Sequence, residues 1–188
     1  MSTATKTAYT PEDLLVMRDG DRYELVNGEL VESNMSMKAA YVAALILRLL
    51  GAFCDTGRLG WLFGEGTTYQ CFPHALGRVR KPDVSFIRLA RLTREEYEEA
   101  GHVTVLPDLA VEVLSPHDTA YEVDQKIQDY QRAKVPLIWK VNPDVRNVMV
   151  YRADGTTALL TENDEITGEN ILPGFRCHVR DFFRLPDA

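Results

Sequence analysis

The sequence predicts an α/β or α+β fold in which helices flank a mixed central β-sheet. Two observations support this prediction: short apolar runs typical of strands alternate with longer segments of helical periodicity, and nothing divides the chain into parts. The 188 residues contain no internal repeat or obvious linker, and their 45% hydrophobic and 26% charged content is that of an ordinary globular protein. We therefore expect a single domain at residues 10–188, preceded by a flexible N-terminal tail at residues 1–9.

Local signals define the expected elements of the N-terminal half. Thr10 is a cap residue followed by Pro11 at the first helical position, so a short helix is expected to begin there. In RYELVNGELVE, the pair Asn27-Gly28 separates two strand-like runs and predicts a β-hairpin. The elements expected next are a long helix at about residues 36–53 and strands near residues 61–71 and 82–88.

The C-terminal half continues this alternation. Thr93 and Glu96 have the spacing of a capping box and predict a helix at residues 93–99. The elements expected after it are a strand around Glu112, a helix at about residues 118–134, strands in PLIWKV and NVMVYR, and a closing segment with ILPGF and a final DFF turn. Strands interleaved with helices in this way are typical of a sheet core covered by helices.

The charge of the chain limits how it can bind nucleic acid. A net charge of −7 argues against wrapping by bulk electrostatics, because such binding draws on an excess of Lys and Arg. One stretch, GRVRKPDVSFIRLARLTRE at residues 77–95, is nevertheless basic, and its cations are Arg78, Arg80, Lys81, Arg88, Arg91 and Arg94. This stretch predicts either a local surface for phosphate groups or a solvated face paired with acids elsewhere.

The cysteines and the apolar segments indicate the compartment. Cys54, Cys71 and Cys177 lie far apart without a CxxC pair, so neither a disulfide framework nor a zinc ribbon is indicated, and a cytoplasmic location fits. The longest apolar stretch, at residues 39–53, is interrupted by Arg48 and is shorter than the roughly 20 apolar residues that cross a bilayer. We expect a buried amphipathic helix there and no membrane partner.

The apolar run LAVEVLSP at residues 109–116 contains one carboxylate, Glu112. Runs of this kind are typical of a central strand covered on both faces, where an ionised group is costly unless a cation or a metal meets it. The alternation of side chains places on one face Asp108, Ala110, Glu112 and Leu114. Asp83 begins another apolar strand directly after Pro82. If the two acids converge, Asp83 and Glu112 suffice as an Mg²⁺ site, since this ion needs only one or two protein carboxylates.

A lysine on the following helix offers a cationic partner for Glu112. The stripe expected to pack on the sheet consists of Val123, Ile127, Tyr130 and Lys134. At 100° per residue, Lys126 lies about 60° from the centre of that stripe and is the basic side chain best placed to bend toward Glu112. The alternative is a lysine that only extends its charge to solvent along an apolar face.

Several strings, taken in order, closely resemble the Uma2-type endonucleases, also called the domain of unknown function 820 family. They are RYELVNGEL, KPDVSF, LPDLAVEVLSP and YQRAKVPLIWKVNPDVRNVMVYR, so the resemblance covers roughly residues 22–152 and continues loosely through LPGF. This family belongs to the PD-(D/E)XK, or restriction-endonuclease-like, superfamily. The resemblance implies an α/β/α core with a mixed central sheet, Mg²⁺-dependent hydrolysis of phosphodiester bonds with Mn²⁺ as a possible substitute, and a motif reading Pro82-Asp83 and then Glu112.

The resemblance also implies roles for further residues. In the usual superfamily motif the lysine lies two positions after the acid, where this chain has Leu114, but Uma2-like members supply it from the following helix, at the position of Lys126. Glu24 matches a further family acid, as a third ligand or a water-positioning group. Lys38 stands where the family often has a histidine. The expected partner is nucleic acid, with DNA as the substrate, phosphate contacts from Arg78, Arg80, Lys81 and Arg88, and a homodimer as the assembly.

Other groups of residues give weaker evidence for a catalytic or metal site. Ser115, His117 and Asp118 have the composition of a nucleophilic triad but lie too close in the chain to stack into one. Pro107-Asp108 repeats the motif letters on the same strand as Glu112, so Pro82-Asp83 is the better match. No metal-ligand spacing joins His74, His102 and His178. The aromatic residues expected in the core or a subunit interface are Tyr121, Tyr130, Trp139 and Tyr151.

A second hypothesis is a catalytically silent module that binds nucleic acid or regulates a complex while keeping the nuclease fold. The acidic net charge is compatible with it. The presence of Asp83, Glu112 and Lys126 argues against it, because apolar packing could replace a buried carboxylate at lower energetic cost.

Overall fold

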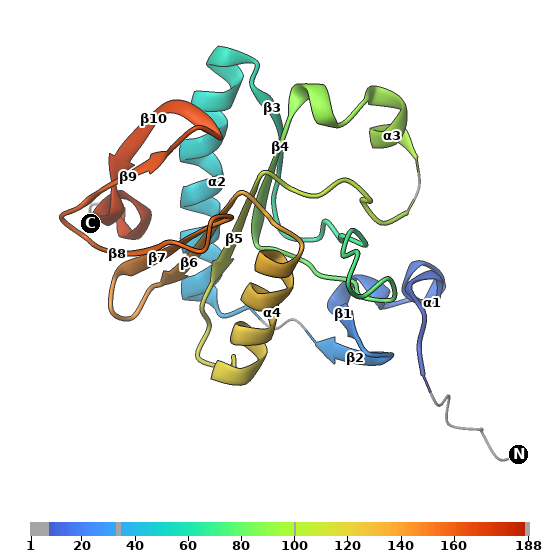
Figure 1. Ribbon diagram of the computed structural model, residues 1–188. Coiled ribbons are helices and arrows are strands. Elements are labelled where there is room, and N and C mark those ends of the chain that lie inside the picture. The colour runs from blue at the N-terminus through green and yellow to red at the C-terminus, as the bar shows by residue number, and fades with distance from the viewer. Residues whose placement is uncertain (1–7, 33–34, 100, 187–188) are drawn as a thin grey trace, which may run out of the picture.

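The computed structural model describes residues 8–32, 35–99 and 101–186 and has a six-stranded sheet at its centre (Figure 1). In spatial order its strands are β3 (Gly60–Phe63), β4 (Val84–Arg88), β5 (Leu109–Val113), β6 (Leu137–Asn142), β7 (Asn147–Arg152) and β8 (Thr157–Thr161). Strands β5 and β6 are parallel, and the other neighbouring strands of this sheet are antiparallel. The predicted mixed sheet with flanking helices is confirmed.

Two helices cover the two faces of this sheet. Helix α2 (Met37–Gly57) packs on the face that carries Leu109, Val111 and Val113, whereas α4 (Ala120–Arg132) packs on the face that carries Ala110 (Figure 1). Because the side chains of a strand alternate between faces, β5 contributes to two separate apolar cores. Every residue of β5 is buried, which explains its nearly continuous apolar sequence.

Helix α4 is the crossover that joins the parallel strands β5 and β6. It begins with a capping box, in which the Thr119 hydroxyl accepts from the Glu122 N–H and the Glu122 carboxylate accepts from the Thr119 N–H. The helix ends at Arg132. Lys134, with a φ of 65°, is exposed beyond this end, so its assignment to the apolar stripe was wrong.

The N-terminal elements lie close to α4 in Figure 1. They are α1 (Pro11–Val16), a 3₁₀ turn at Gly20–Arg22, and the hairpin of β1 (Tyr23–Val26) and β2 (Glu29–Glu32). Asn27 and Gly28 have φ angles of 53° and 82°, the positive values that a tight hairpin turn requires, which confirms the predicted turn. The Tyr9 N–H donates to the Gly28 carbonyl at 2.8 Å, and residues 1–7 of the expected tail lie outside the described residues.

The segment between β3 and β5 is less regular than the sequence indicated. The strand expected at residues 61–71 ends at Phe63, and Gly66 follows with a φ of 105°, which favours glycine. The chain returns at Tyr69 through isolated bridges to Arg80 and Val103. After a 3₁₀ turn at Leu89–Arg91, α3 (Arg94–Glu98) begins with the predicted capping box.

The C-terminal segment closes the core on the α2 side of the sheet. It consists of the antiparallel pair β9 (Glu165–Gly168) and β10 (Leu172–His178), followed by a 3₁₀ helix at Val179–Phe183. The rings of Phe175 and Phe182 lie 6.2 and 5.9 Å from that of Trp139, measured between centroids. The predicted closing segment therefore contributes aromatic packing to the main core.

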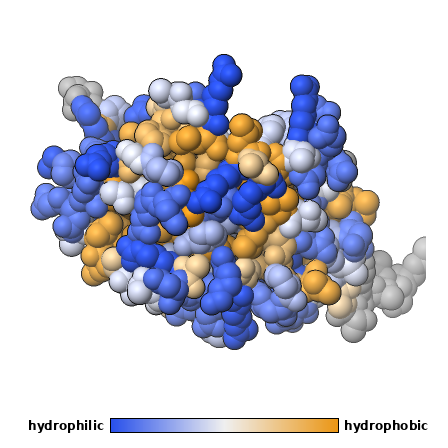
Figure 2. Space-filling view, turned by 45° about the horizontal axis from the view of Figure 1, so that its top comes forward, coloured by the Kyte–Doolittle hydropathy of each residue, from blue (hydrophilic) through white to orange (hydrophobic). Residues whose placement is uncertain are grey.

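Helix α2 is, within the described residues, the one helix that is long and apolar enough to cross a membrane by length and composition. The core helix of a globular protein has the same properties, and α2 buries Ala39, Val42, Ile46 and Leu50 in the main core. Apolar side chains are also visible on the surface in Figure 2, interspersed with charged ones, as is usual for folded proteins.

A pair of glycine substitutions tests the packing of β3 against the sheet. A Cβ at Gly60 would lie 2.1 Å from the Ile87 carbonyl oxygen, so Gly60→Ala is expected to lower the free energy of unfolding by about 1–3 kcal/mol through overpacking. A Cβ at Gly51 in α2 would meet only Leu62, at an ordinary 3.7 Å, so Gly51→Ala should raise stability by about 0.5–1 kcal/mol. Urea unfolding measures both, and equal effects would contradict the assigned register of β3.

Candidate active site

Four ionisable side chains from four parts of the chain converge on the α4 side of the sheet. Glu24 lies on β1, Asp83 directly before β4, Glu112 on β5 and Lys126 on α4. The three acids are only 1%, 7% and 5% exposed, respectively. The Lys126 Nζ atom is 3.2 Å from Glu24 Oε1 and 3.3 Å from Glu112 Oε2. A lysine shared with a second acid is therefore what meets the buried Glu112.

Strand register places Asp83 beside Glu112. In the antiparallel pair of β4 and β5, Val84 lies opposite Val111. Asp83 precedes Val84 and Glu112 follows Val111, so the two acids lie next to each other across the pair. Glu112 contacts α4 through Lys126 and Tyr130. The Val113 N–H donates to Asp83 Oδ2 at 2.6 Å. The two acids of the predicted pair thus come from neighbouring strands and share one side of the sheet.

Glu112 is held by two residues of α4 that are four positions apart. The Tyr130 hydroxyl donates to Glu112 Oε1 at 2.7 Å, and Lys126 donates to Oε2. Burial raises the pKa of Glu112, the charge of Lys126 opposes this rise, and the charge of Glu24 adds to it, so the pKa stays above its ordinary value. Tyr130 was expected only to pack; its position four residues after Lys126, on the same helix face, is the signal that could have indicated its contact with Glu112.

Glu24 differs from the other two acids because cations surround it. Its Oε2 accepts from Arg80 Nη1 at 2.9 Å, and its Oε1 accepts from the Lys81 N–H at 2.8 Å. Burial alone would raise the pKa of Glu24, but the positive charges of Lys126 and Arg80 and these hydrogen bonds together lower it. Glu24 is therefore an ionised carboxylate inside the protein.

Asp83 has the opposite environment. Burial and the nearby charge of Glu112 raise its pKa well above the ordinary value, and the charge of Lys126 and the Val113 N–H only partly oppose this. A further contribution comes from Glu65, an exposed acid in the loop after β3 that the sequence did not single out. Burial and the neighbouring acids therefore disfavour the charged form of Asp83.

Lys126 remains charged in this environment. Burial would lower the pKa of its ammonium group, but the charges of Glu112, Glu24 and Asp83 raise it above its ordinary value. Its side chain is 18% exposed, so the predicted alternative of a lysine that merely extends to solvent does not describe it. The ammonium is a fixed positive charge at the centre of the acids.

The basic stretch at residues 77–95 forms internal contacts, which differs from the expected phosphate surface. Arg80 is 2% exposed and donates from Nε and Nη2 to Asp129 Oδ2 at 2.8 and 2.6 Å. Arg78 Nη1 donates to the same oxygen at 2.7 Å. Lys81 is 5% exposed and donates from Nζ to the Asp21 carbonyl at 2.7 Å. Buried groups with these partners cannot also face the backbone of a bound nucleic acid.

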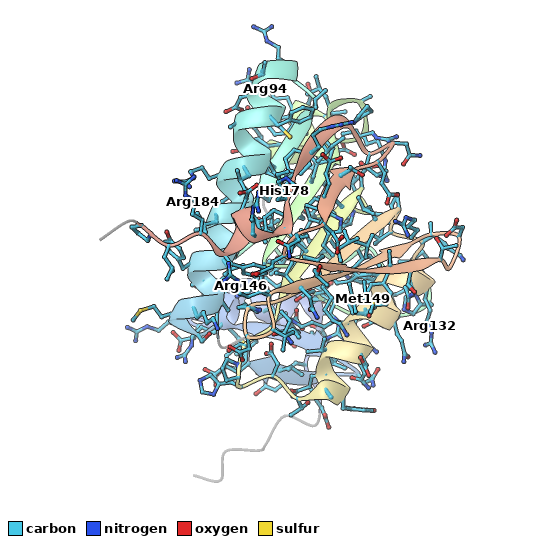
Figure 3. All side chains as sticks on the ribbon, turned by 90° about the vertical axis from the view of Figure 1, so that its left-hand side faces the viewer. Arg94, Arg132, Arg146, Met149, His178 and Arg184 are labelled. Carbon is cyan, nitrogen blue, oxygen red and sulfur yellow. The ribbon has the colours of Figure 1, made fainter. Side chains whose placement is uncertain are left out.

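The remaining cations of this stretch also have partners in the protein. Arg91 Nη1 lies 2.8 Å from Asp108 Oδ1, and Arg88 donates its backbone N–H to Asp108 Oδ2 and its Nη2 to the Asn170 carbonyl. Arg94, labelled in Figure 3, pairs with Glu98 at 2.9 Å, and its side chain is 82% exposed. Asp108, the acid of the repeated motif letters, thus has a structural role and does not belong to the candidate site.

The other residues considered from the sequence lie outside the candidate site. Ser115 Oγ accepts from the Ser36 N–H, and Asp118 Oδ2 accepts from the Ser115 N–H, so both side chains bind backbone N–H groups and form no triad. Lys38 pairs with Asp144 on the surface at 2.7 Å. Tyr121 is 71% exposed, which excludes the core, one of the two positions expected for it, and leaves the subunit interface as a prediction.

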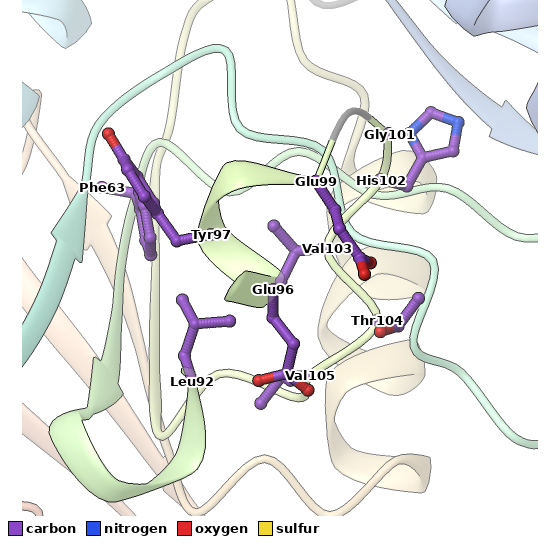
Figure 4. Close-up of a pocket in the computed structure, with 10 residues that line it drawn as sticks. All are labelled: Phe63, Leu92, Glu96, Tyr97, Glu99, Gly101, His102, Val103, Thr104 and Val105. Atoms are coloured by element: carbon purple, nitrogen blue, oxygen red, sulfur yellow. The ribbon is translucent and has the colours of Figure 1, made fainter. Parts of the chain in front are cut away.

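A small pocket of about 180 Å³ lies elsewhere, between α3 and residues 101–105 (Figure 4). None of the four candidate site residues lines it. Its His102 has both ring nitrogens engaged, with Thr68 Oγ1 and the Pro11 carbonyl, each at 2.8 Å. His102 therefore has no free ring nitrogen that could act as a catalytic group in this pocket.

The pair Asp83 and Glu112 is compatible with a hard divalent cation. Within residues 8–32, 35–99 and 101–186, no group of three or more His, Cys, Asp or Glu side chains is arranged to hold a metal ion. Mg²⁺ does not require such a group, because water and substrate oxygens complete its shell around one or two carboxylates. Two neighbouring carboxylates with raised pKa values are oxygen donors that a cation would stabilise in their ionised form.

Comparison with known proteins assigns the chain to a family. A model of the Uma2 family, described as "Putative restriction endonuclease", matches residues 11–180, which include all four converging residues. The chain belongs to the Uma2 family. The structure resembles that titled "Crystal structure of a putative nuclease belonging to DUF820 from Anabaena variabilis ATCC 29413", with a TM-score of 0.77 and 20% identity over 93% of this chain and 97% of that one. The predicted Uma2 membership and restriction-endonuclease-like fold are thereby confirmed, and no curated protein matches the chain.

The ion network beneath the Uma2 site should contribute strongly to stability. Asp129→Asn removes the charge that compensates Arg78 and Arg80, so we expect the free energy of unfolding to fall by about 3–5 kcal/mol, as for other broken buried pairs. The control is Glu98→Gln, which breaks the exposed pair with Arg94 and should change stability by less than about 0.5 kcal/mol. Urea unfolding compares the two, and similar losses would contradict a buried network.

Proposed function

We propose that this Uma2-family protein is an Mg²⁺-dependent endonuclease that hydrolyses phosphodiester bonds of DNA. The observation that supports this most directly is the position of the Lys126 ammonium, 3.3 Å from the buried carboxylate of Glu112 and near a second acid, Asp83, directly before β4. The family match supports the general class of nuclease. The metal, the substrate and the residue roles are our inference from the chemistry of these groups.

In this proposal Asp83 and Glu112 would hold Mg²⁺, with Mn²⁺ as a substitute. When bound, the ion would supply Lewis acidity toward the scissile phosphate and a nucleophilic water. Val113 fixes one oxygen of Asp83, and Tyr130 fixes one oxygen of Glu112, so each ligand is oriented before substrate arrives. Preorganised ligands of this kind avoid reorganisation during the reaction.

Lys126 acts as a positive charge in this proposal. A general base needs a free lone pair, and a lysine whose pKa is raised by three acids does not offer one near neutral pH. Its ammonium is instead suited to orient a water and to offset negative charge that develops on the phosphate in the transition state. We therefore propose that Lys126 orients the water and does not remove its proton.

The approach of nucleic acid cannot depend on the interior part of the basic stretch. Arg80 and Lys81 are buried, and Arg78 is bound to Asp129, whereas the Arg88 side chain is 42% exposed. Of the four expected phosphate contacts, Arg88 is the one that we retain. With a net charge of −7, affinity for the substrate would come largely from the metal and from contacts at the site.

A cleavage assay tests the proposed activity. With Mg²⁺ or Mn²⁺ and plasmid DNA, Asp83→Ala, Glu112→Gln and Lys126→Ala should each reduce the cleavage rate at least about 100-fold, since each removes a group that acts on the transition state. Glu98→Gln, on the exposed face of α3, should cleave at the wild-type rate. Equal residual activity in all proteins would indicate a contaminating nuclease and contradict the proposal.

Metal titration distinguishes this proposal from a silent binding module. Wild-type protein should bind Mn²⁺, and Glu112→Gln should weaken binding by about tenfold or more because it removes one of two carboxylate ligands. Isothermal titration calorimetry measures the affinity. DNA binding without metal binding or turnover would instead support the module.

A further inference from the structure

Glu24 has little capacity left to bind a metal ion. It is 1% exposed, and both of its oxygens already accept hydrogen bonds, Oε2 from Arg80 and Oε1 from the Lys81 N–H. Oε1 also forms an ion pair with the Lys126 ammonium at 3.2 Å. A carboxylate has about four lone-pair positions. Three donors therefore occupy most of the Glu24 carboxylate, and two of them are cations that neutralise its charge.

The metal-binding capacity lies on the other side of Lys126. Asp83 accepts one hydrogen bond among the described residues, from the neutral Val113 N–H, and forms no ion pair there. Glu112 has one oxygen bound to the neutral Tyr130 hydroxyl, and within the described part of the chain its other oxygen has Lys126 as its one polar partner. A divalent cation is therefore attracted to Asp83, which has no ion pair among the described residues, and to Glu112, whose cationic partner Lys126 is shared with Glu24.

Lys126 must move slightly for that binding to occur. Its ammonium contacts Glu112 Oε2, the oxygen that Tyr130 does not bind, at 3.3 Å. A divalent cation on the same oxygen would repel an ammonium at this distance strongly in a buried site. The alternative acceptor is already in contact, since Glu24 Oε1 lies 3.2 Å from the same nitrogen.

Arg80 and Asp129 fix this alternative acceptor. Arg80 donates from Nη1 to Glu24 and from Nε and Nη2 to Asp129, so its planar guanidinium joins the two acids. Asp129 lies three residues after Lys126 on α4, which closes a ring of contacts from Lys126 through Glu24, Arg80 and Asp129 back to the same helix. Through Asp129 and Arg80, helix α4 thereby positions Glu24, the carboxylate that pairs with Lys126 of the same helix.

We infer that Glu24 is a positioning residue that holds Lys126 when the metal binds, not a metal ligand, and that Arg80 and Asp129 keep Glu24 in place for this task. The inference rests on the proposed metal-dependent function. It gives the family acid Glu24 a role that differs from both roles left open by the sequence, those of a third ligand and of a water-positioning group. It also gives Arg80 a role in place of the expected phosphate contact.

A double-mutant cycle with Mn²⁺ as the probe tests this inference without measuring catalysis. Lys126→Met removes the competing ammonium and should increase Mn²⁺ affinity at least about fivefold. Glu24→Gln in the wild-type background should lower affinity about fivefold, because Lys126 then remains on Glu112. In the Lys126→Met background, Glu24→Gln should change affinity less than about threefold, because its effect passes through the lysine.

The outcomes separate the inference from the proposed function. If Glu24→Gln lowers Mn²⁺ affinity about tenfold or more in both backgrounds, Glu24 is a ligand and the inference is overturned. If wild-type protein does not bind Mn²⁺, or Glu112→Gln binds as tightly as wild type, the proposed metal site fails and the inference fails with it. Binding that depends on Glu112 but not on Glu24 after removal of Lys126 supports both.

Further measurements distinguish a change in Mn²⁺ affinity from misfolding of a variant. Circular dichroism and urea unfolding establish that each variant is folded before titration. If Glu24→Gln does not fold, the Mn²⁺ affinity of Lys126→Met tests the inference by itself. Unchanged or weaker binding by this variant would show that Lys126 does not compete with the metal ion for Glu112 and would overturn the inference. Arg80→Lys keeps one charge but loses the guanidinium fork, and it should weaken Mn²⁺ binding only while Lys126 is present.

Discussion

The structure of the site depends on one ammonium group that is shared by two buried carboxylates. Without Lys126, Glu112 and Glu24 would face each other inside the protein, where an uncompensated charge costs several kcal/mol, about 3–5 in comparable pairs. The crossover from β5 through α4 to β6 is what brings this lysine over the sheet. The position of α4 is fixed by its cap at Thr119 and by its buried residues Ile127 and Tyr130. The packing of this helix therefore stabilises the buried charges as well as the apolar core.

Charges of alternating sign continue through the interior from Lys126. Asp129 and Glu24 lie on either side of Arg80, and Glu24 and Glu112 lie on either side of Lys126. Asp83 stands at the end of this series beside Glu112 without a direct cationic partner among the described residues. The series thus pairs the acids on one side of Lys126 with cations and leaves Asp83, on the other side, without one among the described residues. This asymmetry supports the cation site that we propose.

The arginines of residues 77–95 illustrate how a charge cluster in a sequence can belong to the interior. Arg78 and Arg80 pair with Asp129, which lies 51 and 49 residues further along the chain. Arg91 pairs with Asp108 on the far end of β5 from Glu112. A cluster of like charges is a local property, whereas its counter-charges come from other segments, so the sequence left open whether these side chains face solvent.

The sequence by itself determined the mixed sheet with flanking helices, the hairpin at Asn27-Gly28, the helix caps, and the set of Asp83, Glu112 and Lys126, because periodicity and turn chemistry are encoded in neighbouring residues. Tertiary structure alone decided that Lys126 is shared with Glu24, that Tyr130 holds Glu112, and that Arg80 is buried. These contacts join residues from separate strands and a helix. Their geometry follows from how those elements pack, which no local pattern specifies.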